Sequence, residues 1–148
     1  MERKTIKNIL DFLKEKEGKK FPQGWFDYLK KLELIKELEN HPDDIQYRYE
    51  GNLVLSSSVV IKLPNDLYVN GYFDLTDCKK IRNLPDKLYV KSSLYLDGCK
   101  ELINLPSKLY VGRNVLIGDT PLANRYTDEE IRDIVASTGG EIIGLILR

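Results

Sequence analysis

The chain has 148 residues and equal numbers of basic and acidic side chains, 23 of each, so its formal net charge is zero. The length suits a single domain, 1–148, and no segment has the concentrated positive charge that neutralises nucleic-acid phosphates. No apolar run reaches the roughly 18 residues of a membrane span, and the N-terminal residues lack a signal-peptide cleavage site. These features predict a cytoplasmic protein that binds neither nucleic acid nor a membrane.

Residues 1–44 are expected to form a helical cap with two helices. The first has apolar residues at the spacing of one helix face, followed by Gly18, and these residues are Ile6, Ile9, Leu10 and Leu13. The second has a broader apolar stripe, made of Trp25, Tyr28, Leu29, Leu32, Ile35 and Leu38. Such stripes usually pack against a core, so the helices should cover the first coil of the repeats that follow. The alternative is a second binding surface.

His41 is the only histidine, and it lies in the sequence Asn-His-Pro-Asp-Asp between the predicted helices and the repeats. Pro42 and the aspartates after it are typical of a turn. A catalytic histidine needs an orienting partner and a nucleophile within reach. The sequence supplies no such pair, so we expect a structural or solvent-exposed histidine.

The heptapeptide Leu-Pro-x-x-Leu-Tyr-Val occurs three times, at 63–69, 84–90 and 105–111, with a constant 21-residue spacing. A fixed period in this range is the signature of a solenoid, whose units bury their apolar faces by stacking on each other. Each unit has two pairs of alternating apolar residues, Leu88/Val90 and Leu94/Leu96 in the middle one, which predict two short strands. Proline, glycine, serine and asparagine between the pairs mark the corners.

A degenerate copy precedes the three repeats. Residues 47–55 repeat the spacing of residues 88–96, although the stretch to the next proline is one residue shorter. The solenoid is therefore expected over 45–122, with about four coils. Together with the caps it gives an α+β fold, a short β-solenoid-like repeat with an N-terminal helical cap and a C-terminal helix-plus-strand cap.

Segments 73–85 and 94–106 resemble leucine-rich repeats, with Cys78 and Cys99 where that pattern has Asn or Cys. The 21-residue unit with its Leu-Tyr-Val strand, and the closing segment 120–140, resemble more specifically the short repeat proteins encoded by tailed bacteriophages. This resemblance implies a protein that acts in the bacterial host cytoplasm on a host protein, including a host defence component.

The two cysteines occupy the same place in successive coils. Leucine-rich repeats use an inward cysteine here to satisfy backbone groups at the turn, and a reducing cytosol disfavours a disulfide, so two buried thiols are expected. A disulfide is the alternative, because stacked strands bring Cα atoms within bridging range. Two cysteines and one distant histidine do not supply the four ligands of a zinc site. We expect no metal and no cofactor.

The C-terminal cap, 123–148, is expected to contain one helix and one strand. Thr127 and Glu130 fit a capping box, the helix that follows has an apolar face, and Gly139 and Gly140 end it. Residues 141–147 are apolar and β-branched, and they should pair with the last coil.

No motif for catalysis is present: the sequence has no phosphate-binding glycine loop, no Gly-x-Ser-x-Gly and no cluster of metal ligands. Asp77 and Asp97 lie in separate turns and do not form an acid–base pair. The sequence therefore predicts a non-enzymatic protein whose function depends on its surface.

The outward positions of the second strand in each coil are the predicted contact site. This strand forms the concave sheet of leucine-rich repeats, and its outward residues combine aromatic, aliphatic and acidic side chains, as recognition surfaces do. The predicted partner-binding residues are Val54, Tyr72, Asp74, Tyr95, Asp97 and Leu116. The alternative is that they are ordinary solvated strand residues.

Tyr68, Tyr89 and Tyr110 recur with the 21-residue period on the other strand, which we place on the opposite, convex side. Stacked as a ladder, they should stabilise the sheet. A partner rarely shares this symmetry, which favours a structural role. The alternative function is that of a structural or assembly protein, a virion accessory or a homo-oligomer, that uses this ladder or a cap; the sequence does not define the oligomeric state.

Overall fold

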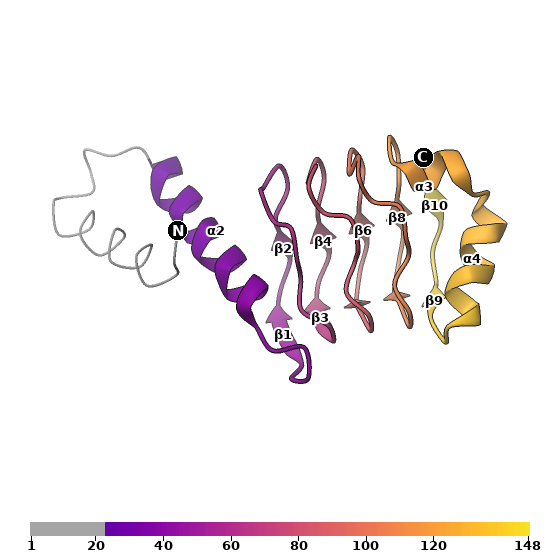
Figure 1. Cartoon of the computed structure of the whole chain (residues 1–148), viewed down its shortest axis with the longest axis horizontal. Helices are drawn as coiled ribbons and strands as arrows, with labels where there is room; N and C mark the ends of the chain where they lie inside the picture. The colour runs from indigo at the N-terminus through magenta and orange to yellow at the C-terminus, as the bar shows by residue number, and fades with distance from the viewer. Residues whose placement is uncertain (1–22) are drawn as a thin grey trace, which may run out of the picture. The chain divides into compact units, whose positions relative to one another are not determined.

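A computed structural model describes residues 23–148 (Figure 1). The chain divides into two units, one that ends at Asn40 and one that begins at His41. In the first unit, α2 spans Gln23–Asn40, which confirms the second predicted helix. The first predicted helix lies outside the described residues. That these helices cover the first coil stays a prediction.

The second unit is a β-solenoid in which each coil has two strands and a return segment without a strand (Figure 1). The first strands form one parallel sheet, in the order β1 (Tyr47–Glu50), β3 (Leu67–Asn70), β5 (Tyr89–Val90), β7 (Tyr110–Val111) and β9 (Glu141–Ile142). The second strands form another, in the order β2 (Leu53–Val54), β4 (Phe73–Asp74), β6 (Leu94–Tyr95), β8 (Val115–Leu116) and β10 (Ile146–Leu147).

The register of the strands follows the repeat. Tyr68 pairs with Tyr89, and Tyr89 with Tyr110, at the 21-residue spacing. The first coil is one residue shorter, as predicted, because Tyr47 pairs with Leu67. The last pairing joins Tyr110 to Glu141, so the final turn is longer than the others.

The α+β solenoid prediction is confirmed. From the strand pair β1/β2 to the pair β7/β8 the chain makes about three full turns, with a repeat of about 21 residues. Helices lie in the N-terminal region and near the C-terminus. This arrangement is consistent with a leucine-rich-repeat-like fold.

The core is a set of stacked aliphatic columns. Residues of the two predicted pairs, Leu88/Val90 and Leu94/Leu96, are all fully buried, and so are their counterparts in the preceding coil, Leu67, Val69, Phe73 and Leu75. Alternation places these residues on one face of each strand. The three residues between the pairs interrupt the alternation, and there the chain turns the corner between the two sheets.

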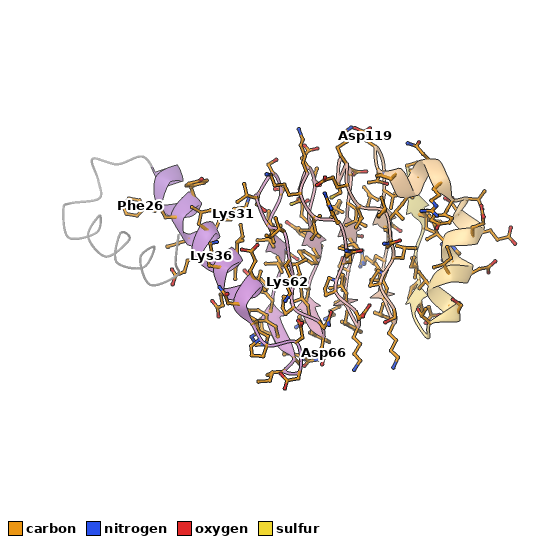
Figure 2. All side chains as sticks on the ribbon, in the orientation of Figure 1. Phe26, Lys31, Lys36, Lys62, Asp66 and Asp119 are labelled. Atoms are coloured by element: carbon orange, nitrogen blue, oxygen red, sulfur yellow. The ribbon has the colours of Figure 1, made fainter. Side chains whose placement is uncertain are left out.

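Two columns of left-handed residues close each coil. Non-glycine residues with positive φ recur with the repeat: Ser57, Asp77 and Asp119 after the second strand, and Asp66, Lys87 and Lys108 before the first. Figure 2 labels Asp66 and Asp119, which lie at opposite ends of the coils. Gly98 fills the remaining place in the first column, at φ 76°. A Cβ there would collide with the Asp77 carboxylate, so only glycine fits without a shift.

Side-chain oxygens at the corner before the first strand link successive coils. Asp43 accepts a hydrogen bond from the Asn65 backbone N–H, Asn65 accepts one from Asp86, and Asp86 accepts one from Ser107, each at 3.0 Å. Backbone donors that no strand partner reaches are satisfied in this way. The recurrence of Asn and Asp at this position therefore has a structural cause.

The two cysteines are buried and form no disulfide, as predicted. The thiol of Cys78 donates to the backbone oxygen of Leu55 at 3.0 Å, and that of Cys99 donates to Leu75 at 3.1 Å. Thr120 takes the equivalent place in the next coil and donates to Ile117. These side chains satisfy backbone oxygens inside the turn.

The C-terminal cap contains two helices, one more than expected: α3 (Pro121–Arg125) and α4 (Asp128–Ser137). The capping box is confirmed, since Thr127 accepts from the Glu130 backbone at 3.1 Å and Glu130 accepts from the Thr127 backbone at 3.0 Å. The predicted pairing of 141–147 with the last coil is also confirmed, as two strands, β9 and β10.

Arginines close the exposed edge of the last coil. Arg132 of α4 donates to the backbone oxygens of Ile142, at 2.7 Å, and Gly144. Arg148 donates to the Asp128 carboxylate at 2.8 Å and to the backbone oxygen of Tyr126 at 2.7 Å. Without Arg132, the carbonyls of Ile142 and Gly144 would be free to pair with another chain, whereas Arg148 ties the C-terminal residue to the segment between the two helices.

Candidate functional site

The outer side of the β2–β4–β6–β8–β10 sheet, here called the second-strand face, holds the predicted contact residues. Strand register aligns Val54, Asp74, Tyr95 and Leu116 in one column, and Leu147 of β10 extends it. Four of the six predicted residues thus lie side by side across the sheet. The inward residues next to them are fully or almost fully buried, so the column stands on a packed core.

The other two predicted residues, Tyr72 and Asp97, flank this column. The rings of Tyr72 and Tyr95 meet edge to face, with centroids 5.7 Å apart and an interplanar angle of 80°. Asp97 accepts a hydrogen bond from the Gly118 backbone N–H at 2.7 Å, and Asp74 accepts one from Thr76 at 2.9 Å. Each carboxylate therefore has a structural role, although its other lone pairs can still accept bonds from a partner.

The C-terminal end of the second-strand face is apolar. Leu145 is 62% exposed and Leu147 39% exposed, whereas Ile146 between them points inward. At the other end, Val54 is 42% exposed. Sequence reasoning missed Leu145 and Leu147, although the predicted pairing of 141–147 with the last coil contained the signal: its alternation turns every second residue outward.

The tyrosine ladder lies on the adjoining side of the coil, which differs from the opposite side that we predicted. Only Gly71 and Tyr72 separate β3 from β4, and Figure 1 shows the first strand of each coil leading directly into the second. The return segment, not the first strand, runs back across the coil. The two sheets are therefore neighbouring sides of the solenoid.

The predicted stacking of the ladder is confirmed. The rings of Tyr68 and Tyr89 are 4.4 Å apart at 3°, and those of Tyr89 and Tyr110 are 4.5 Å apart at 7°. Arg48 continues the column in the first coil, with its guanidinium 4.1 Å from the Tyr68 ring centre. Burial in the stack raises the pKa of the Tyr89 hydroxyl.

A charged group ends the ladder at the first coil. Glu50 accepts hydrogen bonds from Asn70 at 2.6 Å and from Arg48 at 2.5 Å. The bond from Asn70, and then that from Arg48, lowers the pKa of the Glu50 carboxyl. These bonds hold the Arg48 guanidinium over the Tyr68 ring, so the charged end of the ladder is paired within the chain.

A groove runs along the return segments, on a side that sequence reasoning did not single out. Its first part, with a volume of about 500 Å³, lies between the first two return segments. A second hollow continues it to the third return segment and shares Asn65, Asn83 and Leu84 with the first. We call the two together the return-side groove.

His41 has structural contacts. Its Nε2 lies 2.8 Å from the backbone oxygen of Ile45, and its ring meets Tyr47 edge to face at 5.0 Å. Within residues 23–148, no three His, Cys, Asp or Glu side chains are placed to hold a metal ion. None of the helices in this range is long and apolar enough to cross a membrane.

Comparisons of the chain with protein-family models, with curated proteins and with solved structures found no match. The proposals about its function therefore rest on the fold and on the side chains that the three sides of the coil present.

Proposed function

We propose that the chain is a non-enzymatic protein-binding module and that the second-strand face is its contact surface. The observation that carries this proposal is the column of Val54, Asp74, Tyr95, Leu116 and Leu147 across five strands. The solvated face of a sheet ordinarily alternates polar residues with buried ones. In this column four of the five outward positions hold aliphatic or aromatic side chains.

The chemistry of this face suits a folded protein partner. Tyrosine is enriched among the residues that dominate binding energy, and it works best where surrounding contacts exclude water. Tyr95 lies in the middle of the column, in contact with Tyr72 and next to Leu116. The backbone beneath is fixed by the strand ladder, so little conformational entropy is lost on binding.

The resemblance to short repeat proteins of tailed bacteriophages supports a finer proposal. The chain is phage-encoded and acts in the bacterial cytoplasm on a host protein, including a host defence component. This step rests on the likeness of the repeat units, since a fold alone does not determine a partner.

A structural or assembly role is the second candidate, and one observation favours it. Ile143 of the C-terminal cap is 53% exposed, and it lies close in sequence to Leu145, 62% exposed, at the apolar end of the second-strand face. Exposed apolar patches often mark contacts between copies. Light scattering decides this point, because a monomer at high concentration contradicts self-assembly.

The test of the main proposal compares two triple variants as bait in bacterial lysate. The first, Tyr95→Ala with Leu116→Ala and Leu147→Ala, removes the centre of the second-strand face. The control, Tyr68→Ala with Tyr89→Ala and Tyr110→Ala, removes the tyrosine ladder. Both change outward side chains, and circular dichroism verifies the fold of each.

The first variant should retrieve the wild-type partners at least about tenfold less well, because truncating central anchors typically costs about 2 kcal/mol or more. The ladder variant, if folded, should retrieve them undiminished. Undiminished retrieval by the folded first variant would reject the second-strand face. If only the ladder variant lost the partners, the contact surface would be the tyrosine ladder and not the second-strand face.

A further inference from the structure

The three return segments concentrate positive charge that is not apparent along the chain. Residues 58–66, 79–87 and 100–108 contain seven basic and three acidic side chains, whereas the remainder of 41–112 contains two basic and six acidic. Because the coils stack in register, the three segments lie on one side of the solenoid. A stretch that is neutral in sequence therefore has one basic side.

The return-side groove lies on this basic side. Lys62, Lys80 and Arg82 line its first part, together with Asn65 and Asn83. Figure 2 labels Lys62 on the first return segment. The groove has both the charge to attract an anionic chain and amide groups that can donate and accept hydrogen bonds along it.

Two carboxylates line the groove, Asp43 in its first part and Asp86 in its second, against the three cations of the first part, so the lining keeps a positive excess. Asp43 lies 3.8 Å from Lys62, and Glu101 lies 3.4 Å from Arg82. All four side chains are at least 43% exposed, so these pairs are weak and open to competition from a ligand. Lys80 forms no ion pair with any described residue.

Apolar side chains alternate with the charges along this side. Ile61 is 61% exposed and Ile103 45% exposed, while Leu84 is almost buried and lines both parts of the groove. The return segments contain no strand, and the proline in each lacks an N–H, so they offer a ligand no regular row of backbone donors. A ligand would have to bind through side chains.

We propose that the return-side groove binds an extended acidic peptide segment, with carboxylates at Lys62, Lys80 and Arg82 and aliphatic side chains near the exposed isoleucines. A nucleic acid fits less well, because the lining of the groove contains no aromatic side chain on which a base could stack. The site is independent of the second-strand face.

The test measures fluorescence anisotropy with three dye-labelled probes: the hexapeptide Glu-Leu-Asp-Glu-Ile-Asp, its charge-reversed counterpart Lys-Leu-Lys-Lys-Ile-Lys, and single-stranded oligothymidylate. Full-length protein is titrated at about 0.05 M and about 0.5 M NaCl, across which electrostatic attraction is strongly screened. The variant is Lys62→Glu with Lys80→Glu and Arg82→Glu. The control, Lys91→Glu with Arg113→Glu and Arg125→Glu, changes three exposed cations outside the groove and alters the net charge equally.

The acidic peptide should bind with a Kd below about 0.5 mM at low salt, and the charge-reversed peptide should not bind. Affinity should fall at least about tenfold at high salt and in the groove variant, and less than about threefold in the control. Three results overturn the proposal: no binding of the acidic peptide, an equal loss in both variants, or tighter binding of oligothymidylate, which would assign the basic side to nucleic acid.

Discussion

Cys78 and Cys99 show how single side chains hold neighbouring coils together. Each thiol donates a hydrogen bond to a backbone oxygen of the preceding coil, inside a core that excludes water. Burial, and then the proximity of Cys78, raises the pKa of the Cys99 thiol to about 12. The thiolate is the reactive form, so Cys99 should be chemically inert in the folded protein.

Thiol labelling tests this account at the scale of the residue. In native protein at a pH of about 8, an aromatic disulfide reagent should modify neither cysteine over hours, and in concentrated urea it should modify both within minutes. Absorbance of the released chromophore measures the rate. Rapid labelling of Cys99 in protein whose circular dichroism stays native would show that the coil interior is open.

Individual inward residues could be predicted because period-2 alternation and the 21-residue repeat agree at every position, as at Leu88 and Leu94. The structural roles of Asp74 and Asp97 could not be. Each accepts a backbone N–H through a corner geometry that depends on φ and ψ, and the sequence shows only that an acidic residue stands there.

At the scale of the element, the C-terminal cap closes the solenoid by two means. Helix α4 covers β9, and Arg132 on this helix bonds two carbonyl oxygens of the last coil. The start of α4 was predictable, because Thr127 and Glu130 form a capping box with a known sequence pattern. The contact of Arg132 was not, because it depends on how α4 lies over the strand.

Removing that contact should both destabilise and expose the edge. Arg132→Ala leaves two backbone oxygens without their charged donor, which should lower the free energy of unfolding by about 1–3 kcal/mol. The open edge should also raise the tendency to associate. Urea denaturation measures the first effect and light scattering the second.

Arg113→Ala is the matched control, since Arg113 is an exposed arginine in an earlier coil. It should change the unfolding free energy by less than about 0.5 kcal/mol. Equal stability of the Arg132→Ala variant and the wild-type protein would contradict the role of the edge contact.

Helix α3 illustrates a local signal that sequence reasoning overlooked. Thr120 caps this helix by accepting from the Ala123 backbone N–H, and Pro121 is its first residue. Threonine before proline is a common helix start. The greater length of the final turn follows from the helices inserted between β8 and β9.

At the scale of the whole molecule, the repeat converts a neutral sequence into a solenoid with three different sides. One side carries a mostly apolar column, the next a tyrosine ladder, and the third a basic groove. Counting charge in consecutive segments could not reveal the third side, since residues 41–112 contain nine basic and nine acidic side chains. Counting by position within the 21-residue unit does reveal it. That count describes a surface only because the coils stack in register, which brings equivalent positions of successive units side by side.

Deletion of one coil tests the stacked architecture most directly. The one-repeat deletion removes residues 74–94 and joins Phe73 to Tyr95, so that Phe73 takes the place of its register partner Leu94. The remaining coils should stack as before, because each unit contacts only its neighbours. The control is a half-repeat deletion, which removes residues 74–84 and places Pro85 directly after Phe73, out of phase with the repeat.

Urea denaturation followed by circular dichroism is the measurement. The one-repeat deletion should unfold cooperatively, with a lower free energy and a smaller m-value than the wild-type protein, because less surface is buried. The half-repeat deletion should show no cooperative transition. An unfolded one-repeat deletion, or a half-repeat deletion that folds equally well, would contradict the account of coils that stack in step with the sequence repeat.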